Sequence, residues 1–212
     1  MTQVHVITKY NRSSHENYLE QYYRLRHDVF VGERGWRDLD SENGIERDAY
    51  DDSNAIYLLA IDDGRVVGGQ RLYPTLLPHM MTDVFPSLAS RGVPRAPDIL
   101  EWTRYFVVRE RRTGRTDCRL LAAMQEYCLA EGIRQVTAVV EMWWLPRWQQ
   151  VGFKVRPLGL PTLIENEPCI AALIDVSQRS LDTVRQMAGL RGPSLSRVGD
   201  LSNQDRVPYV AA

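Results

Sequence analysis

The run of ten residues at 99–108, ILEWTRYFVV, limits the possible folds more than any other part of the chain. Apolar and aromatic side chains fill most of it, which predicts a long, largely buried β-strand. Glu101 and Arg104 nevertheless lie inside the run, and alternation along a strand would place them on opposite faces. Burying a carboxylate and a guanidinium costs free energy unless each is paired or used. The run therefore predicts a central strand that carries two charged groups into the interior of a domain.

The segments around this strand alternate between helical and extended patterns. Residues 55–61 and 65–74 are apolar runs joined by Asp62, Asp63 and Gly64, which together are a strong hairpin signal. Spacing and composition predict helices at 17–33, 80–85, 115–132, 144–153 and 177–188. Further extended runs predict strands at 4–8, 135–142 and 168–176.

This order of elements favours one α/β domain over residues 1–188. Helices on both faces of a sheet cover such an order most simply, so we expect a three-layer αβα sandwich around a mixed, mostly antiparallel sheet. No linker rich in proline or glycine divides the domain. Residues 189–212 are rich in Gly, Pro and Ser, and we expect them to form a loosely held tail.

Charge, cysteine content and hydropathy exclude several classes of function. The formal net charge is −1, which gives no general attraction for nucleic acid. The chain has three cysteines without CxxC spacing, and its four histidines form no metal-ligand cluster. No run is long and apolar enough to span a membrane, and no apolar signal segment begins the sequence. We therefore expect a cytoplasmic protein without disulfides or a bound metal.

A loop rich in arginine follows the long strand. Glycine lets backbone N–H groups approach a ligand, while arginines and a helix N-terminus attract phosphate. A solvated basic turn is the alternative. The spacing Arg111-x-x-Gly114-x-Thr116 loosely resembles the pyrophosphate-binding loop of the GNAT acyltransferase superfamily. That resemblance implies a central strand that splays from its neighbour to admit an acyl thioester.

An ordered set of side chains narrows the resemblance to one family. The set is Arg26, Phe30, Trp36, Asp48, Asp51, Arg71, Glu101 and Arg104. It resembles the acyl-homoserine lactone synthases, the autoinducer synthases of bacterial quorum sensing, and the expected fold extends the likeness to about residue 159. The resemblance implies that acyl-CoA or acyl carrier protein acylates the amine of S-adenosylmethionine. The substrate carboxylate then displaces methylthioadenosine to close a lactone, and no cofactor is implied.

The resemblance also implies roles for these residues. A sulfonium and an adenine favour aromatic walls and nearby carboxylates. We therefore expect S-adenosylmethionine to contact Arg26, Phe30, Trp36, Asp48, Asp51 and Arg71. Glu101 and Arg104 are the candidate catalytic residues, with Glu101 as general base, acting directly or through a water. A structural network of ion pairs among the same groups is the alternative, because such networks mimic active sites.

The acyl thioester is expected along the second half of the long strand. Backbone N–H groups near the splay, in the stretch from Phe106 to Val108, would stabilise the thioester oxyanion. The pantetheine phosphate would contact Arg111, Arg112, Gly114 and Arg115. The sequence suggests no Ser–His–Asp or Cys–His set, so we expect direct transfer without an acyl-enzyme.

Bulky residues distinguish the expected acyl pocket from the family pattern. Trp102 stands where the family has a small aliphatic residue. We expect the pocket to be lined by Trp102, Thr103, Tyr105, Met142, Trp143 and Trp144. Such a pocket favours a short, branched or aromatic acyl group, although packing in the core is the alternative for these aromatics. Two lysines and a net charge of −1 leave little basic surface for an acidic carrier protein, so acyl-CoA is the favoured donor.

Two other functions are compatible with the same residues. One is an ordinary GNAT N-acyltransferase, which would not need Phe30, Trp36, Asp48 and Asp51 in these positions. The other is an inactive ligand-binding protein on the same fold, against which Arg26, Glu101 and Arg104 argue.

Overall fold

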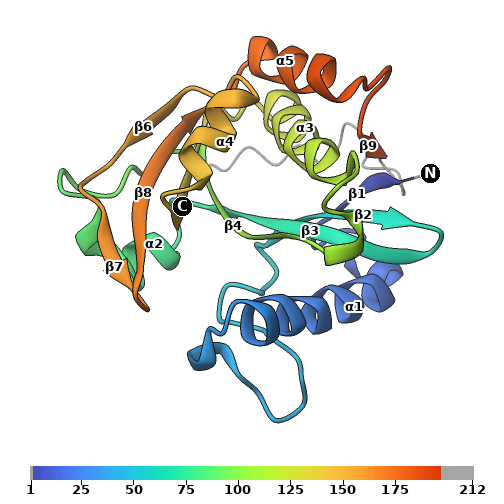
Figure 1. Ribbon diagram of the computed structural model, residues 1–212, viewed down its shortest axis with the longest axis horizontal. Coiled ribbons are helices and arrows are strands. Elements are labelled where there is room, and N and C mark those ends of the chain that lie inside the picture. The colour runs from blue at the N-terminus through green and yellow to red at the C-terminus, as the bar shows by residue number, and fades with distance from the viewer. Residues whose placement is uncertain (1, 197–212) are drawn as a thin grey trace.

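The computed structural model describes residues 2–196, which form a mixed β-sheet with helices on both faces (Figure 1). The strand order is β6-β8-β5-β4-β3-β2-β1-β9, and β7 pairs with β8. The β4–β5 and β1–β9 pairs are parallel and the other pairs are antiparallel. The strands are β1 (Gln3–Ile7), β2 (Ile56–Asp62), β3 (Arg65–Pro74), β4 (Ile99–Val107), β5 (Gln135–Glu141), β6 (Val155–Pro157), β7 (Thr162–Ile164), β8 (Glu167–Asp175) and β9 (Leu195–Ser196).

One long helix covers one face of the sheet, and two others cover the opposite face (Figure 1). The α-helices are α1 (Glu16–His27), α2 (Met80–Asp83), α3 (Thr116–Ala130), α4 (Trp144–Gln150) and α5 (Gln178–Ala188). Short 3-10 turns lie at Arg12–His15, Arg37–Leu39, Pro86–Leu88 and Arg109–Arg111. With α1 on one side and α3 and α5 on the other, the predicted three-layer αβα sandwich is confirmed.

Two apolar cores follow from alternation along the strands. On β2, Ile56, Leu58 and Ala60 face α3, while Tyr57 and Leu59 face α1. The α1 layer packs very close to β3, because a Cβ added at Gly69 would meet the ring of Tyr22 at 2.7 Å. Glycine is therefore required where this helix crosses the sheet.

The predicted helix at 17–33 changes character before its end. It is α-helical to His27, and Asp28–Glu33 continues as a π-helix. Such wide turns are rare and are frequent near functional sites. Here the π-helix brings Phe30 and Arg34 over the sheet beside the end of β4.

The parallel pair β4–β5 opens along its length, as predicted. Their pairing covers Ile99–Glu101 against Gln135–Thr137. Beyond that point β4 continues to pair with β3, and β5 continues to pair with β8. The sheet therefore splits into two arms at Glu101, which leaves one edge of β4 open to a ligand.

A bulge in β4 overturns the predicted alternation of its charges. Arg71 pairs with Thr103 but Gly69 pairs with Phe106, so the β4 segment has one extra residue. Arg104 takes this place with a φ of 54°, and the bulge reverses the faces of the residues that follow. Arg104 therefore reaches the α1 side, where its guanidinium and the carboxylate of Glu101 both contact Met80. The prediction that the two charges face opposite sides is wrong.

The described part of the predicted tail, residues 189–196, is more ordered than predicted. Residues 189–196 were expected to be loose, but β9 pairs with β1 in parallel. The carboxylate of Glu126 on α3 accepts from the backbone N–H groups of Ser194 and Leu195, which fixes this segment. The rest of the predicted tail, 197–212, lies outside the described residues. In the described chain, no helix has the length and apolar character needed to cross a membrane.

Candidate active site

A cluster of buried charges lies between the sheet and the loop that follows the π-helix. Arginines from α1, β3 and β4 meet acidic side chains from residues 46–51 of this loop. Five of its six members are residues that the sequence singled out. The cluster consists of Arg26, Arg71, Arg104, Glu46, Asp48 and Asp51.

Arg26 and Asp51 form the innermost pair of this cluster. Both are almost completely buried, and Nη1 of Arg26 donates to both carboxylate oxygens of Asp51 at 2.8 and 2.9 Å. Burial raises the pKa of Asp51, but the charges of Arg26 and Arg71 outweigh it and hold that pKa well below its usual range. The pair is shielded on every side and supports the groups around it.

Asp48 and Arg104 lie at the outer edge of the cluster. Their side chains are 18% and 7% exposed, against 0% for Arg26 and Arg71. Nη2 of Arg104 lies 2.9 Å from Asp48, which also accepts from Arg71 at 2.6 Å. A ligand can therefore reach Asp48 and Arg104 most directly, while Arg71 contributes its charge from behind.

Glu46 is the member that the sequence did not reveal. It is 2% exposed, and its carboxylate accepts from Nε of Arg26 and from Arg104 at 3.0 Å. The sequence singled out Asp48 and Asp51 from this loop but not Glu46. Its position in an irregular loop gave no periodic signal, and only its nearness in sequence to Asp48 could have pointed to it.

Glu101 lies beside the cluster at the point where β4 and β5 separate. It is 2% exposed, and its two oxygens accept from the backbone N–H groups of Met80 at 3.1 Å and Met81 at 2.6 Å. Burial raises the pKa of Glu101 to about 7, although these N–H groups and the charge of Arg71 oppose that rise. A carboxylate with a pKa near neutrality is suited to general-base catalysis.

An aromatic stack covers the outer side of Arg104. The rings of Phe30 and Trp36 are parallel within 10° at 5.2 Å, and the guanidinium of Arg104 lies 5.9 Å from Phe30. Arg34 lies over both rings, and its Nη1 donates to Glu141 on β5 at 3.0 Å. The predicted aromatic wall is thus assembled next to the charged cluster.

The backbone of β4 narrows the predicted oxyanion donors. The N–H of Val108 donates to the carbonyl of Val67 at 3.0 Å, so it is used within the sheet. Alternate residues of a strand direct their N–H groups to the same side, which points Phe106 toward β3 as well. Within the predicted stretch from Phe106 to Val108, these two N–H groups are therefore directed into the sheet. Val107, between them, directs its N–H toward the open edge left by β5.

The arginine loop divides between two locations. Nε of Arg112 donates to the carbonyl of Val107 at 2.9 Å, and its Nη2 lies 2.7 Å from Glu33. Arg111 instead pairs with Asp62 at the end of β2, at 2.7 Å. Gly114 and Arg115 immediately precede α3. Arg112 is therefore placed beside the open edge of β4, whereas Arg111 is turned away toward the β2–β3 hairpin.

Three of the six predicted acyl-pocket residues come together on the opposite face of β4. Trp102 and Trp144 are buried, and Tyr105 makes edge contacts with both at 5.7 and 5.1 Å. Trp148 was not among the predicted pocket residues, although it is 1% exposed and stacks on Trp102 at 5.4 Å. Its spacing of four from Trp144 on a predicted helix was the signal that could have found it.

Three members of the predicted pocket lie elsewhere. The hydroxyl of Thr103 accepts from Nε of Arg71 at 3.1 Å, so the bulge leaves Thr103 on the charged face. Trp143 stacks on Trp144 but is 54% exposed. Met142 is half-buried, and its backbone N–H donates to Pro168 at 2.9 Å. The aromatic wall between β4 and α4 is therefore built from Trp102, Tyr105, Trp144 and Trp148.

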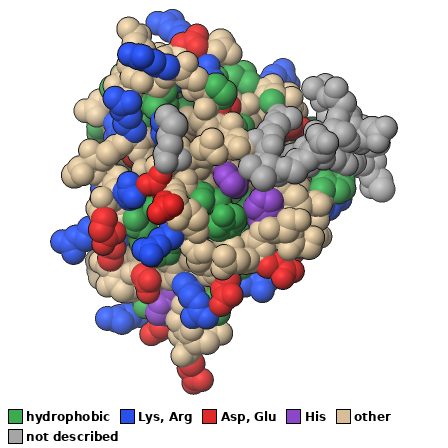
Figure 2. Space-filling view, turned by 90° about the vertical axis from the view of Figure 1, so that its right-hand side faces the viewer, with side chains coloured by type: hydrophobic (Ala, Val, Ile, Leu, Met, Phe, Trp, Pro, Cys, Tyr) green, Lys and Arg blue, Asp and Glu red, His purple; other side chains and the backbone are tan. Residues whose placement is uncertain are grey.

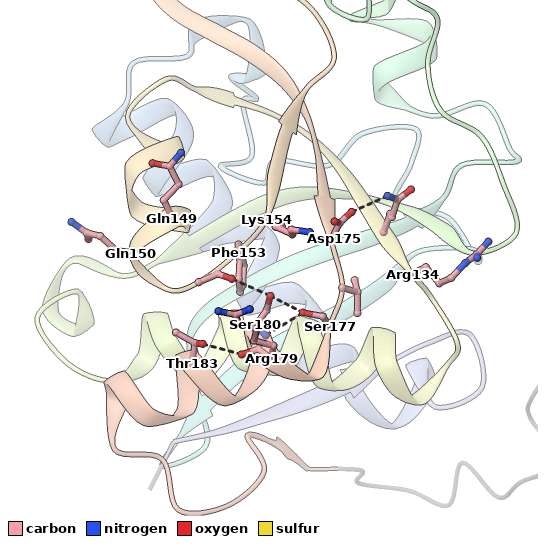
Figure 3. A pocket seen from close by; sticks show the side chains of 13 residues that line it. Arg134, Gln149, Gln150, Phe153, Lys154, Asp175, Ser177, Arg179, Ser180 and Thr183 are labelled. Atoms are coloured by element: carbon pink, nitrogen blue, oxygen red, sulfur yellow. Dashed lines mark hydrogen bonds between the residues drawn. The ribbon is translucent and has the colours of Figure 1, made fainter.

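A separate hollow of about 1040 Å³ lies between the end of α4 and the start of α5 (Figure 3). Its lining includes Lys154, Asp175 and Arg179, and Ser177 there accepts from the backbone N–H of Ser180 at 3.1 Å. None of its lining residues belongs to the charged cluster or to the aromatic wall. This hollow and the candidate chemistry are therefore in different parts of the molecule.

The split sheet, the buried carboxylate at the split and the basic loop leading into α3 define an acyltransferase with a GNAT-like fold. An acyl-CoA N-acyltransferase from Pseudomonas aeruginosa, 16% identical, aligns with a TM-score of 0.58 over 82% of this chain and 99% of that one. That likeness concerns the fold alone.

The autoinducer synthase family model matches residues 9–184, and the chain belongs to this family. An isovaleryl-homoserine lactone synthase from Bradyrhizobium diazoefficiens is 52% identical over 188 residues, which are 88% of this chain and 86% of the relative. The structure of a CoA-dependent acyl-homoserine lactone synthase, BjaI, with SAM and isopentyl-CoA aligns with a TM-score of 0.91 at 49% identity, covering 94% and 95% of the two chains. Another CoA-dependent synthase, MesI, aligns with a TM-score of 0.86 at 38% identity, covering 92% and 99%.

Proposed function

We propose that this protein makes an N-acyl-L-homoserine lactone from S-adenosylmethionine and a short, branched acyl-CoA. The observation that carries the proposal is the position of Glu101. It is a buried carboxylate at the fork of the sheet, with the charged cluster on one side and the open edge of β4 beyond it. The names of the similar proteins support both the product and the CoA donor.

The outer members of the charged cluster would bind the amino acid part of S-adenosylmethionine. Arg104 offers a guanidinium to the substrate carboxylate, and Asp48 offers a carboxylate to the ammonium. The stack of Phe30 and Trp36 gives the adenine and the sulfonium an aromatic wall. Arg26 and Asp51 hold the outer groups in place without contacting the substrate.

Acylation then needs a free amine and a stabilised thioester oxyanion. Glu101 would take a proton from the α-ammonium, directly or through a water. The amine attacks the thioester carbonyl, whose oxygen accepts from the N–H of Val107. When the tetrahedral intermediate collapses, the C–S bond breaks, and the departing CoA sulfur takes the remaining extra proton of the nitrogen and leaves as the thiol.

Lactone closure uses the leaving group that the substrate already carries. The substrate carboxylate attacks its own γ-carbon, the bond from this carbon to the sulfonium breaks, and its electron pair neutralises the sulfur. Methylthioadenosine leaves, and the lactone carries no charge. Both substrates supply all the reacting atoms, so we propose no cofactor. Both are cytoplasmic metabolites, and we place the reaction there.

The size of the acyl group follows from the aromatic wall on the α3 face of β4. The indole rings of Trp102 and Trp148 fill the space that a long acyl chain would need. The face of the molecule in Figure 2 mixes acidic and basic side chains among its described residues, which is not the arrangement that an acidic carrier protein would seek. Both observations support a short acyl-CoA.

A donor panel tests this function. The purified protein is incubated with S-adenosylmethionine and with isovaleryl-, butyryl-, octanoyl-, decanoyl- or cinnamoyl-CoA, and mass spectrometry measures lactone and methylthioadenosine. We expect lactone and methylthioadenosine in equal amounts, with isovaleryl-CoA preferred. Preference for decanoyl-CoA, or much faster turnover of the matching acyl carrier protein, would overturn the donor and acyl assignments. Acyl transfer to another amine without methylthioadenosine would identify an ordinary N-acyltransferase.

A further inference from the structure

Gln70 connects β3, α3 and Trp102 within the apolar core. Its side chain is completely buried on the α3 face of the sheet. Its Nε2 donates to the carbonyl of Leu120 at 2.7 Å, and its Oε1 accepts from the indole Nε1 of Trp102 at 2.7 Å. An indole N–H can only donate and a carbonyl can only accept, so a single orientation of the amide satisfies both partners. Gln70 is therefore fixed, and it fixes the indole in turn.

A glutamine at this position needs a reason beyond filling space. Methionine has a similar volume and could occupy an apolar core without the cost of burying an amide. The carbonyl of Leu120 lies inside α3, where the helix already provides a donor for it. What the amide adds is direction, because a hydrogen bond fixes the rotation of the Trp102 indole and apolar contact alone does not.

The rotation of Trp102 determines the shape of the wall it belongs to. Its ring stacks on Trp148 at 5.4 Å and meets the edge of Tyr105 at 5.7 Å. Tyr105 is anchored separately, because its hydroxyl donates to Asp117 at 2.5 Å. Trp102 is thus held in place by a hydrogen bond to Gln70 on β3. Without this bond the indole could rotate, and the space beside Tyr105 would become larger.

We propose that Gln70 is a positioning residue for acyl-chain selection: it holds the Trp102 indole across the acyl pocket and so excludes longer chains. This inference rests on the proposed lactone synthesis. Gln70 contacts no reacting atom, and it acts through the orientation of Trp102.

The test compares Gln70→Met with a matched control, Gln125→Met. Gln125 is also completely buried, and its Oε1 accepts from the N–H of Ser177 at 3.0 Å, on the far side of α3. For Gln70→Met we expect the ratio of kcat/KM for isovaleryl-CoA to that for octanoyl-CoA to fall by about tenfold, with the KM for S-adenosylmethionine unchanged. Gln125→Met should keep the wild-type ratio.

A double-mutant cycle and an NMR signal separate positioning from general loosening. Phenylalanine lacks the indole N–H, so in a Trp102→Phe background Gln70→Met should change the ratio by less than about twofold. The chain has five tryptophans, and Trp102→Phe assigns the indole N–H signal of Trp102. In Gln70→Met this signal should shift and exchange faster with solvent.

Three results would overturn the proposal. They are a folded, active Gln70→Met enzyme with the wild-type ratio, an equal change of ratio in Gln125→Met, and an undiminished effect of Gln70→Met in the Trp102→Phe background. If the wild-type protein makes no lactone from any CoA ester, the proposed function fails and this inference fails with it. An active wild type with an unchanged ratio in Gln70→Met overturns the inference alone.

Discussion

The two faces of β4 carry opposite kinds of chemistry. Toward α1 lie Glu101 and Arg104, joined to a cluster of ion pairs. Toward α3 lie Trp102 and Tyr105, joined to other aromatic rings. The first face is suited to proton transfer and to binding charged groups, and the second to selecting an apolar chain by its length. Under the proposed function, rate and acyl selectivity would be set by separate groups on neighbouring residues of the same strand.

The bulge at Arg104 makes this separation possible. With a φ of 54°, Arg104 is in a conformation that costs an L-residue of the order of 1–3 kcal/mol. The hydroxyl of Tyr22 donates to the carbonyl of Arg104 at 3.1 Å and helps to hold it there. Thr103 and Arg104 thereby both serve the charged face, while Tyr105 is released to the aromatic one.

The largest expected effect concerns the charged face. Glu101→Gln keeps the shape of the side chain but removes the base, so we expect kcat to fall roughly 10²–10⁴-fold for every acyl-CoA. In the wild type, kcat/KM should rise with pH and level off above about pH 7, because burial raises the pKa of Glu101 to about 7 and only the ionised form is a base. Steady-state kinetics at several pH values test the lower kcat of the variant and the pH dependence of the wild type. Glu110→Gln, an exposed change in the arginine loop, is the control. A Glu101→Gln enzyme with near wild-type kcat would reject the assignment.

The next effect concerns the support beneath that face. Arg26→Met removes a fully buried guanidinium that pairs with both Glu46 and Asp51, and leaves these two buried carboxylates to Arg104 and Arg71, so we expect a loss of about 3–5 kcal/mol in the free energy of unfolding. The exposed ion pair between Arg24 and Glu20 on α1 is the comparison with the buried cluster. Arg24→Gln should lower the free energy of unfolding by about 0.3–0.5 kcal/mol. Urea denaturation measures the loss for each variant. Equal losses would mean that the buried cluster stabilises the fold no more than a surface ion pair does.

The sequence predicted the parts of the site that repeat a family pattern or a regular period. The hairpin, the long strand and the ordered set from Arg26 to Arg104 were all recognisable, and the splay was implied by the resemblance. Glu46 was not recognisable, because it lies in a loop whose conformation depends on its contacts. The bulge was equally hidden, since a single extra residue in a strand leaves no trace in the pattern yet reverses the faces of Arg104 and Tyr105.

A third prediction concerns stability and compares Glu101 with the paired acids. Its pKa rises from 4.5 to about 7 on folding, so the folded state favours the neutral carboxyl. Stability due to this group is therefore present below about pH 4.5 and is lost as pH rises through 7. Relative to Glu101→Gln, the wild type should lose about 3 kcal/mol of unfolding free energy between about pH 4 and pH 8. Denaturant unfolding at several pH values checks this, and a constant difference would contradict the raised pKa.

The smallest effect concerns the aromatic face. Trp102→Val replaces an indole with a small aliphatic residue, as the family pattern has, and opens space beside Trp148. We expect kcat/KM for octanoyl-CoA to rise at least tenfold relative to isovaleryl-CoA, roughly what a methylene or two is worth in an apolar pocket. The KM for S-adenosylmethionine should stay unchanged. If the KM for S-adenosylmethionine changed instead, Trp102 would contact that substrate and not the acyl chain.

One competition assay tests the division of labour between the two faces most directly. Wild type, Glu101→Gln and Trp102→Val each receive S-adenosylmethionine with an equal mixture of isovaleryl- and octanoyl-CoA, and mass spectrometry measures the two lactones. Glu101→Gln should lower both products equally and keep their ratio, whereas Trp102→Val should keep the total rate and change the ratio. A changed ratio in Glu101→Gln, or an equal loss of both products in Trp102→Val, would contradict separate control of rate and selectivity.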